Sequence, residues 1–327
     1  MTPADFHATA LDRTRNVLVD LDDAFRLLLA ALLVGGNVLV EGVPGTAKTL
    51  MARCLAQLLA TDVEMPNVGL NRGHFQRVQF TPDLMPSDIL GTNVFNAATA
   101  TFTFRPGPIF ANVVVADEVN RAPAKTQSAL LEAMEEHQVT VEGQRLPLPA
   151  VFIVVATQNP IEFEGTYPLP EAQLDRFLFK LLVEHGSAAT ERQVVLHHHA
   201  GLQVGDLLAA GLEPLVDPTA ILELRAQVAA VDVDTSVADY LVAIGRATRA
   251  APEAQYGASV RGAIGLLHAS KALAAFAGRD YVTPDDVKAV AAPVLRHRLV
   301  LKPEAELDGL RPDDVVQRIL GSVPVPR

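Results

Sequence analysis

Short apolar runs alternate with helical patterns through the first 185 residues of the chain. The runs are NVLV, RVQF, NVVVA, VFIVVAT and RFLFKLLV. Continuous valine, isoleucine and leucine runs of this length are typical of parallel strands that helices bury on both faces. Residues 1–185 are therefore predicted to form an α/β domain with a doubly wound parallel sheet.

The pattern changes after about Gly186. From Ser187 onward we find only helical periodicity rich in alanine and leucine, and no strand is expected. One helix start is explicit in the run TPDD, because Thr283 can act as the N-cap before Pro284, with Asp286 at the third helical position. Residues 186–327 are predicted to form an all-helical domain.

Two short insertions interrupt the α/β pattern. The run NVFNAATATFTFRPGPIF at 93–110 alternates phenylalanine and threonine around a polar turn, and HQVTVEGQRLPLPA at 137–150 alternates around Glu142–Gly143. Both patterns predict β-hairpins. From the pattern alone, decorative surface loops and functional insertions are equally good interpretations.

Composition and charge narrow the classes of function. The 327 residues include 27 Lys and Arg against 38 Asp and Glu, a formal net charge of −11. A negative field repels phosphate backbones, so nucleic-acid binding is disfavoured. The longest apolar run, Leu27–Val40, is too short for a membrane span. A single cysteine, Cys54, and the absence of a secretory pattern favour a cytoplasmic location.

A glycine-rich loop follows the first predicted strand. Residues 42–49, GVPGTAKT, match G-x-x-x-x-G-K-[ST] except that Ala47 replaces the last glycine. Lys48 would reach the β- and γ-phosphates of ATP, and the Thr49 hydroxyl would hold Mg²⁺. Residue 47 is expected to have helical φ and ψ, which alanine adopts freely and only a positive φ would exclude. The candidate nucleotide-binding residues here are Gly42, Val43, Pro44, Gly45, Thr46, Ala47, Lys48, Thr49 and Leu50.

Two later strands end in polar residues. Asp117 and Glu118 follow NVVVA, at the carboxyl edge where open α/β sheets bind ligands. Asp117 would hold Mg²⁺ through water, and Glu118 would polarise the water that attacks the γ-phosphate. Asn159 ends the next strand and could orient that water, although an Asn-Pro turn without a chemical role is the alternative.

Two arginines are further candidates. Arg176 in LPEAQLDRF could be an arginine finger inserted into an adjacent subunit's site, or a surface ion pair with Asp175 or a neighbour. Arg261 lies near a helix start, where it could fold back on the nucleotide. The run His197–His199 ends a helical stretch, and adjacent residues splay around a helix, so solvated or capping imidazoles are expected rather than a metal site.

Taken together, these residues resemble the MoxR family of AAA+ ATPases from about Asn37 to Arg298. LVEGVPGTAKT is similar to that family's phosphate loop, in which alanine before the lysine is usual. The longer matching runs are VVVADEVNRAPAKTQSALLEAMEEHQVTVEG, VVATQNPIEFEGTYPLPEAQLDRF and QFTPDLMPSDILG. One departure is Val260, where the family often has a proline, and this affects how Arg261 is aimed.

The resemblance implies an AAA+ nucleotide-binding core over 1–185 and a helical lid over 186–327, with ATP and Mg²⁺ as cofactors. It implies a helix-2 insert near 93–104 and a pre-sensor-1 hairpin near 138–148, which face the pore or a client in such rings. Hexameric rings, a separate partner with a von Willebrand factor A domain, and chaperone-like maturation of other complexes are also implied. The implied roles are Walker A for Gly42–Thr49, Walker B for Asp117 and Glu118, sensor 1 for Asn159, arginine finger for Arg176 and sensor 2 for Arg261.

Three alternatives stay open from the sequence. A nucleotide-dependent scaffold with little turnover is opposed by the intact Glu118, Asn159 and Arg176. A motor acting on nucleic acid is opposed by the acidic total and by the lack of a basic, aromatic-interleaved module. A magnesium-chelatase-like subunit is the third alternative.

Overall fold

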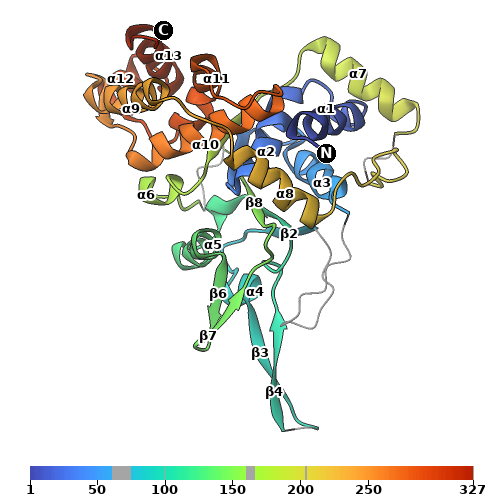
Figure 1. The fold of residues 1–327 in the computed structure, drawn as a ribbon. Coiled ribbons are helices and arrows are strands. Elements are labelled where there is room, and N and C mark those ends of the chain that lie inside the picture. The colour runs from blue at the N-terminus through green and yellow to red at the C-terminus, as the bar shows by residue number, and fades with distance from the viewer. Residues whose placement is uncertain (61–74, 99, 160–165, 203–204, 327) are drawn as a thin grey trace.

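The computed structural model describes residues 1–60, 75–98, 100–159, 166–202 and 205–326. Its centre is a parallel sheet of five strands in the order β2-β5-β8-β1-β9 (Figure 1). The sheet confirms the predicted doubly wound α/β class, and each of the five apolar runs supplies one strand. The strands are β1 (Val38–Gly42), β2 (Phe75–Gln79), β5 (Val113–Asp117), β8 (Ile153–Gln158) and β9 (Phe179–Val183).

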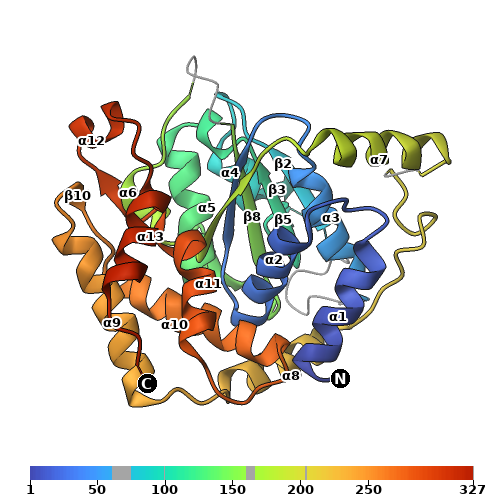
Figure 2. The same ribbon diagram turned by 90° about the horizontal axis from the view of Figure 1, so that it is seen from above.

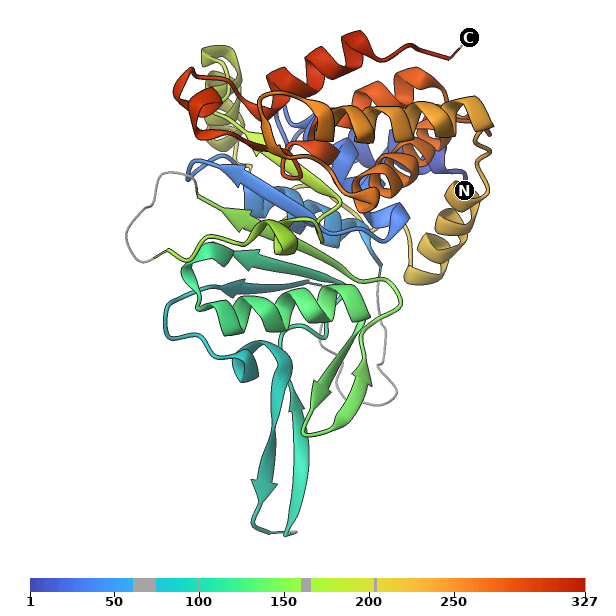
Figure 3. The ribbon, with the colours of Figure 1, turned by 90° about the vertical axis from the view of Figure 1, so that its left-hand side faces the viewer.

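Helices cover both faces of the sheet, as the continuous apolar strands require. In β1, Val38 and Val40 belong to the cluster formed with α2 (Asp22–Val34) and α3 (Lys48–Leu58), whereas Leu39 belongs to the cluster formed with α5 (Ala124–Glu136). This alternation follows from the two-residue period of a strand. Figure 3 shows α5 lying along the face turned toward the viewer, with the helical region above the sheet.

Both predicted hairpins are present. β3 (Gly91–Asn96) pairs with β4 (Thr101–Pro106), and β6 (Gln138–Val141) pairs with β7 (Gln144–Pro147), both antiparallel. They project from the same end of the molecule, β3 and β4 farthest (Figures 1 and 3). A hydrogen bond of 2.7 Å from the Asn93 amide to the Glu142 carboxylate links the two hairpins, so they form one connected projection.

Helices dominate the chain after residue 187, and α11 begins with the predicted capping box between Thr283 and Asp286. The expectation of no strand was wrong. β10 (Ala254–Tyr256) pairs with β11 (Val300–Leu301), and segments this short carry no readable periodicity. The helices are α7 (Ala188–His199), α8 (Pro218–Ala229), α9 (Thr235–Ala250), α10 (Val260–Phe276), α11 (Pro284–Leu295), α12 (Pro303–Leu307) and α13 (Pro312–Ser322).

The remaining helices are α1 (Pro3–Thr14), α4 (Pro86–Leu90) and α6 (Glu171–Leu174). Seen from above in Figure 2, α1 and α8 lie together beside α10. No helix among the described residues is long and apolar enough to cross a bilayer.

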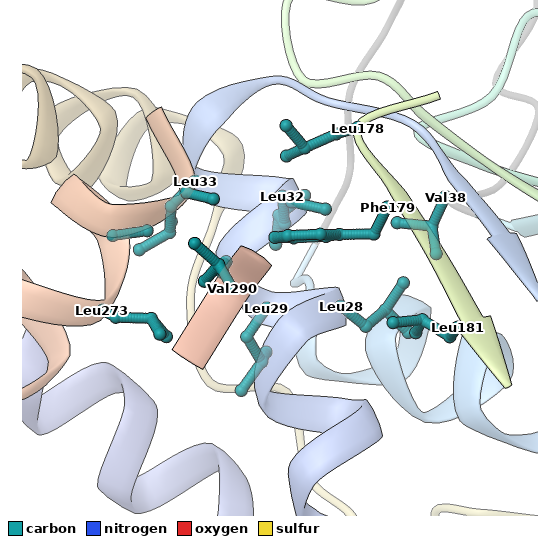
Figure 4. Close-up of a cluster of buried hydrophobic side chains, with 14 of the residues drawn as sticks. Leu28, Leu29, Leu32, Leu33, Val38, Leu178, Phe179, Leu181, Leu273 and Val290 are labelled. Atoms are coloured by element: carbon teal, nitrogen blue, oxygen red, sulfur yellow. The ribbon is translucent and has the colours of Figure 1, made fainter. Parts of the chain in front are cut away.

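A single hydrophobic core joins the sheet to the later helices. Figure 4 shows four leucines of α2, including Leu28 and Leu32, placed between strand residues and helix residues. Phe179 of β9 lies on the sheet side, and Leu273 of α10 and Val290 of α11 lie on the helical side. All belong to one cluster of buried residues, so burial of these apolar side chains stabilises the contact between the two regions.

The residues that follow α11 bind the segment that precedes β9. Arg298 has only 3 % of its side chain exposed. Its guanidinium donates to the backbone carbonyls of Asp175, Phe177, Leu178 and Val294 at 2.5–3.2 Å, and to the Asp175 carboxylate at 2.7 Å. Burial lowers the pKa of Arg298, and the Asp175 carboxylate opposes this shift. A buried cation is tolerated here because acceptors surround it.

Next to it, His297 is buried as a neutral imidazole. Its Nε2 lies 3.0 Å from the carbonyl oxygen of Phe177, and its Nδ1 has no hydrogen-bond partner among the described residues. Burial, reinforced by the positive charges of Arg298, Lys180 and Arg296, holds the pKa of His297 well below its usual value of 6.5. The unfolded chain therefore binds a proton below that pH that the folded chain does not.

We predict that this difference makes stability fall as the pH falls below about 6.5. For one such histidine the loss is about 1.4 kcal/mol per pH unit, down to the pKa of the folded state. His297→Gln should remove that share of the slope, whereas His199→Gln, at an exposed position, should leave it unchanged. Urea unfolding between pH 5 and 7 measures the slopes. Equal slopes for the two variants would mean that His297 is not held neutral.

Candidate active site

A cavity of about 570 Å³ opens where β1, β5 and β8 end. The carboxyl ends of parallel strands meet at one edge of a sheet, so residues far apart in the sequence converge there. The phosphate loop, the acidic pair and the sensor candidate all line this cavity. These lining residues are Pro44, Gly45, Thr46, Ala47, Lys48, Thr49, Leu50, Asp117, Glu118 and Asn159.

The backbone conformation of the phosphate loop explains why positions 42 and 45 are glycine. A Cβ at Gly42 would collide with the backbone oxygen of Val183, and Gly45 has a φ of +85°. Ala47 also has a positive φ of 59° with a ψ of 18°. The expectation of a helical Ala47 was therefore wrong. Alanine stands in left-handed conformation one residue before α3, and the loop holds it there at a cost of about 1–2 kcal/mol.

Lys48 lies folded over this loop. Its Nζ donates to the carbonyl oxygens of Gly42 and Val43 at 2.5 and 2.7 Å. Burial lowers the pKa of Lys48, while the carboxylates of Asp117 and Glu118 act in the opposite direction. A partly buried ammonium beside a loop of amides is suited to an anionic ligand such as a polyphosphate.

Asp117 is the most connected acidic group of the cavity. Its Oδ1 accepts a short hydrogen bond from the Thr157 hydroxyl, and its Oδ2 lies 3.5 Å from the hydroxyl of Thr49. The Arg77 guanidinium donates to Oδ2 from Nε at 2.9 Å and from Nη2 at 2.6 Å. Adjacent carboxylate and hydroxyl oxygens are the hard ligands that Mg²⁺ prefers, so Asp117 and Thr49 fit a magnesium site.

Glu118 follows Asp117 with a φ of 54°, again in the left-handed region. Its backbone N–H donates to the Thr157 hydroxyl at 2.9 Å. Its carboxylate accepts from the amide of Gln79 at 2.8 Å and from the guanidinium of Arg121 at 2.9 Å. Both ends of this residue are thereby fixed, and its carboxylate is presented at the cavity.

Sequence reasoning missed three of these positioning residues. Arg77 and Gln79 lie in the run RVQF, and Thr157 lies in VFIVVAT. For Gln79 and Thr157 the available signal was a polar residue at or next to the last position of a strand, whereas Arg77 is the third residue of β2 and carried no such signal. Such residues face the same edge as the acidic pair, because the strands are parallel and in register.

The other side of the cavity is apolar. The apolar lining residues come from the segment before α2, from α3, from α7 and from the segment after α7. A flat heterocycle, such as a nucleotide base, fits an apolar surface of this kind. His197 and His198 also line it, and His197 Nδ1 lies 2.9 Å from the backbone oxygen of Asn16. The apolar lining residues are Val17, Val19, Leu21, Leu50, Val194 and Leu202.

The three histidines of the run His197–His199 lie at the end of α7. No group of three histidine, cysteine or acidic side chains in the described ranges is arranged to hold a metal. The sequence did not predict that the imidazoles of His197 and His198 border this cavity. They do so because helix α7 lies across one side of the cavity.

The structure does not bring Arg176 and Arg261 to this cavity; neither is among the described residues that line it. Both contact Glu135 of α5 instead. They border a separate hollow with Asn37, which directly precedes β1. A strand of five residues spans roughly 16 Å, so the arginines lie at the amino edge of the sheet and the cavity at its carboxyl edge.

Comparisons with known proteins agree with this geometry. Residues 37–179 match the model of the ATPase family associated with various cellular activities (AAA), and residues 246–319 match the AAA lid domain. The chain is 41% identical over 330 residues to Chaperone MoxR1 of Mycobacterium tuberculosis, covering 97% of this chain and 82% of that protein. It is 46% identical over 317 residues to uncharacterized protein YeaC of Bacillus subtilis, covering 97% and 94%.

A solved structure is also similar. A protein from Cytophaga hutchinsonii that is described as a candidate ATPase superposes with a TM-score of 0.87 at 38% identity. The match covers 99% of this chain and 96% of that one. At this identity and coverage, the similarity extends over the helical region as well as the sheet.

We predict that Ala47→Gly is neutral or stabilises the protein by up to about 1 kcal/mol, because glycine adopts the left-handed conformation without strain. The matched control is Ala56→Gly, in the interior of α3, which should cost about 1 kcal/mol or more. Urea unfolding of the two variants compares the two free energies. If both variants lose stability equally, residue 47 does not have a positive φ in the folded protein.

Proposed function

The chain belongs to the MoxR family of AAA+ ATPases, and from this membership we propose that it hydrolyses ATP in a Mg²⁺-dependent reaction. The observation that carries the proposal is the convergence of Lys48, Thr49, Asp117, Glu118 and Asn159 on one cavity. Lys48 and the amides of the loop would bind the phosphates, and the apolar side of the cavity would receive the base. The left-handed backbone at residue 47 supports a loop shaped for a ligand.

Each polar side chain of the cavity has a role in the proposed reaction. Glu118 acts as the general base that polarises the attacking water, and Asn159 orients that water. Thr49 and Asp117 would hold Mg²⁺, which neutralises phosphate charge when it is bound. Arg77 now contacts the same Asp117 oxygen that faces Thr49, so its guanidinium must shift or share that oxygen with the cation.

The positions of Arg176 and Arg261 are the reason to propose a ring. One chain holds Arg176 and Arg261 at the edge of the sheet opposite to its own cavity. A role at a phosphate therefore requires the cavity of a neighbouring copy, and an arginine supplied in trans can be worth roughly 10³–10⁵ in rate. We propose that both act in this way, in a closed ring of identical subunits that is hexameric.

The proposed use of the cycle is chaperone-like remodelling of other proteins, as the name of the relative Chaperone MoxR1 suggests. The projecting hairpin β3–β4 offers a contact surface. Phe95 and Phe102 are 54% and 70% exposed, with ring centroids 5.2 Å apart. A separate partner with a von Willebrand factor A domain and action in the cytoplasm stay predictions from the family resemblance.

For hydrolysis, we predict that Glu118→Gln retains ATP binding and loses turnover by about 100-fold or more, because the general base is removed. Lys48→Ala should lose binding itself. Glu223→Gln, an exposed change of the same kind on α8, should match the wild type. Phosphate release and equilibrium binding of a fluorescent ATP analogue measure the two properties. A wild type that binds ATP without turnover would support the scaffold alternative instead.

The stalled Glu118→Gln protein also serves to identify clients. Affinity capture with and without ATP, with Lys48→Ala as the control, should recover a defined protein complex only in the ATP state. Recovery of nucleic acid, or of nothing that depends on ATP, would argue against the remodelling proposal.

For action in trans, we predict that Lys48→Ala and Arg176→Ala are each nearly inactive alone and regain part of the activity when mixed. A mixed ring contains sites in which an intact phosphate loop meets an intact arginine. Subunits are exchanged at low concentration and then assembled with ATP, and turnover is compared with the sum of the separate variants. If the turnover of the mixture only equals the sum of the two separate variants, Arg176 does not act in the site of a neighbouring subunit.

A further inference from the structure

One carboxylate contacts both of the distant arginines. Glu135 Oε2 lies 3.2 Å from Nε of Arg176, and Glu135 Oε1 lies 2.7 Å from Nη2 of Arg261. Each oxygen of the carboxylate therefore serves a different arginine. Glu135 comes from helix α5 and is itself 37% exposed, so the three side chains meet at the surface.

The backbones that carry the two arginines are also tied together. The Ser259 hydroxyl donates to Asp175 Oδ2 at 3.0 Å and accepts from the backbone N–H of Arg261 at 3.1 Å. Asp175 precedes Arg176 and is held by the buried Arg298. Arg176 additionally donates from Nη1 to the backbone oxygen of Leu131 in α5 at 2.8 Å. The start of α10, the segment before β9 and α5 thus form one connected set.

We propose that Glu135 is a positioning residue that holds Arg176 and Arg261 together as one two-arginine element for the neighbouring subunit's ATP. The inference rests on the proposed function in trans. Two guanidinium groups repel each other, and long side chains lose much rotamer freedom when they are fixed. A carboxylate between them cancels the repulsion and orders both side chains before the neighbour's phosphates arrive.

The exposure of Glu135 and the two arginines favours a positioning role for Glu135 over a purely structural one. An ion pair this exposed contributes little to stability, because water screens it. Its geometry nevertheless uses both oxygens and two arginines from different regions of the chain. A polyphosphate carries more charge than one carboxylate, so it can draw the guanidinium groups toward itself while Glu135 limits their spread.

The test uses two neighbouring glutamates of α5. Glu135→Gln removes the charge between the arginines. Glu136→Gln makes the same change at an exposed position, where the carboxylate has no hydrogen bond or ion pair among the described residues. We expect Glu135→Gln to lower kcat roughly 10- to 100-fold with little change in KM for ATP or in the thermal midpoint. Glu136→Gln should match the wild type.

Two further measurements separate positioning from general damage. In an Arg176→Ala, Arg261→Ala background, Glu135→Gln should have no further effect on kcat, because the groups that it positions are absent. Mixing Glu135→Gln with Lys48→Ala should raise turnover above the sum, since the Lys48→Ala subunits supply intact arginine pairs. Additive losses, or a mixture that stays at the sum, would overturn the inference.

Different results would show that the proposed function itself, rather than the role of Glu135, is wrong. If the wild type does not hydrolyse ATP, or if Arg176→Ala hydrolyses normally, action in trans is wrong whatever Glu135 does. The positioning contact is then judged by NMR, through exchange of the Arg176 Nε proton with water. We expect slow exchange in the wild type and Glu136→Gln and fast exchange in Glu135→Gln; equally fast exchange in all three would refute the contact.

Discussion

The buried guanidinium of Arg298 is the interaction on which the arrangement of the helical region depends. A charge removed from water must keep nearly all of its hydrogen bonds, and here the acceptors are carbonyls of the segment before β9 together with the Asp175 carboxylate. The end of α11 is thereby fixed to the sheet at one place. Because Asp175 also binds Ser259, the start of α10 is fixed at the same place.

This fixed docking divides the chemistry between two edges of the sheet. The phosphate loop, Asp117, Glu118 and Asn159 gather at the carboxyl edge, where parallel strands end. Arg176 and Arg261 are held at the amino edge with Glu135. In the proposed function, a single chain therefore contains all of the required residue types but does not form a complete site. The assembly of copies, rather than a movement within one chain, is the simplest way to bring both sets to one phosphate.

Two residues at the carboxyl edge of the sheet have a strained backbone conformation. Ala47 and Glu118 both have positive φ values, directly beside the expected phosphates and the attacking water. Such conformations persist only where the surroundings determine them, and Thr157 does so for Glu118 through its backbone N–H. At Ala47 the expectation of a helical φ from local sequence was wrong, because the surrounding loop overrides the local preference.

The sequence by itself determined the five strands of the central sheet, the two hairpins, the predominance of helices after residue 187 and the polar residues of the phosphate loop and the acidic pair. Each of these follows from local periodicity or from a motif of fixed spacing. Only the tertiary structure decided the conformation of Ala47, the contacts of Arg77 and Thr157 with Asp117, and the strand pair β10–β11. It also decided that Arg176 and Arg261 share Glu135. The physical reason is that these features depend on contacts between segments 40 to 126 residues apart, or on crowding by neighbouring backbone, which no local pattern encodes.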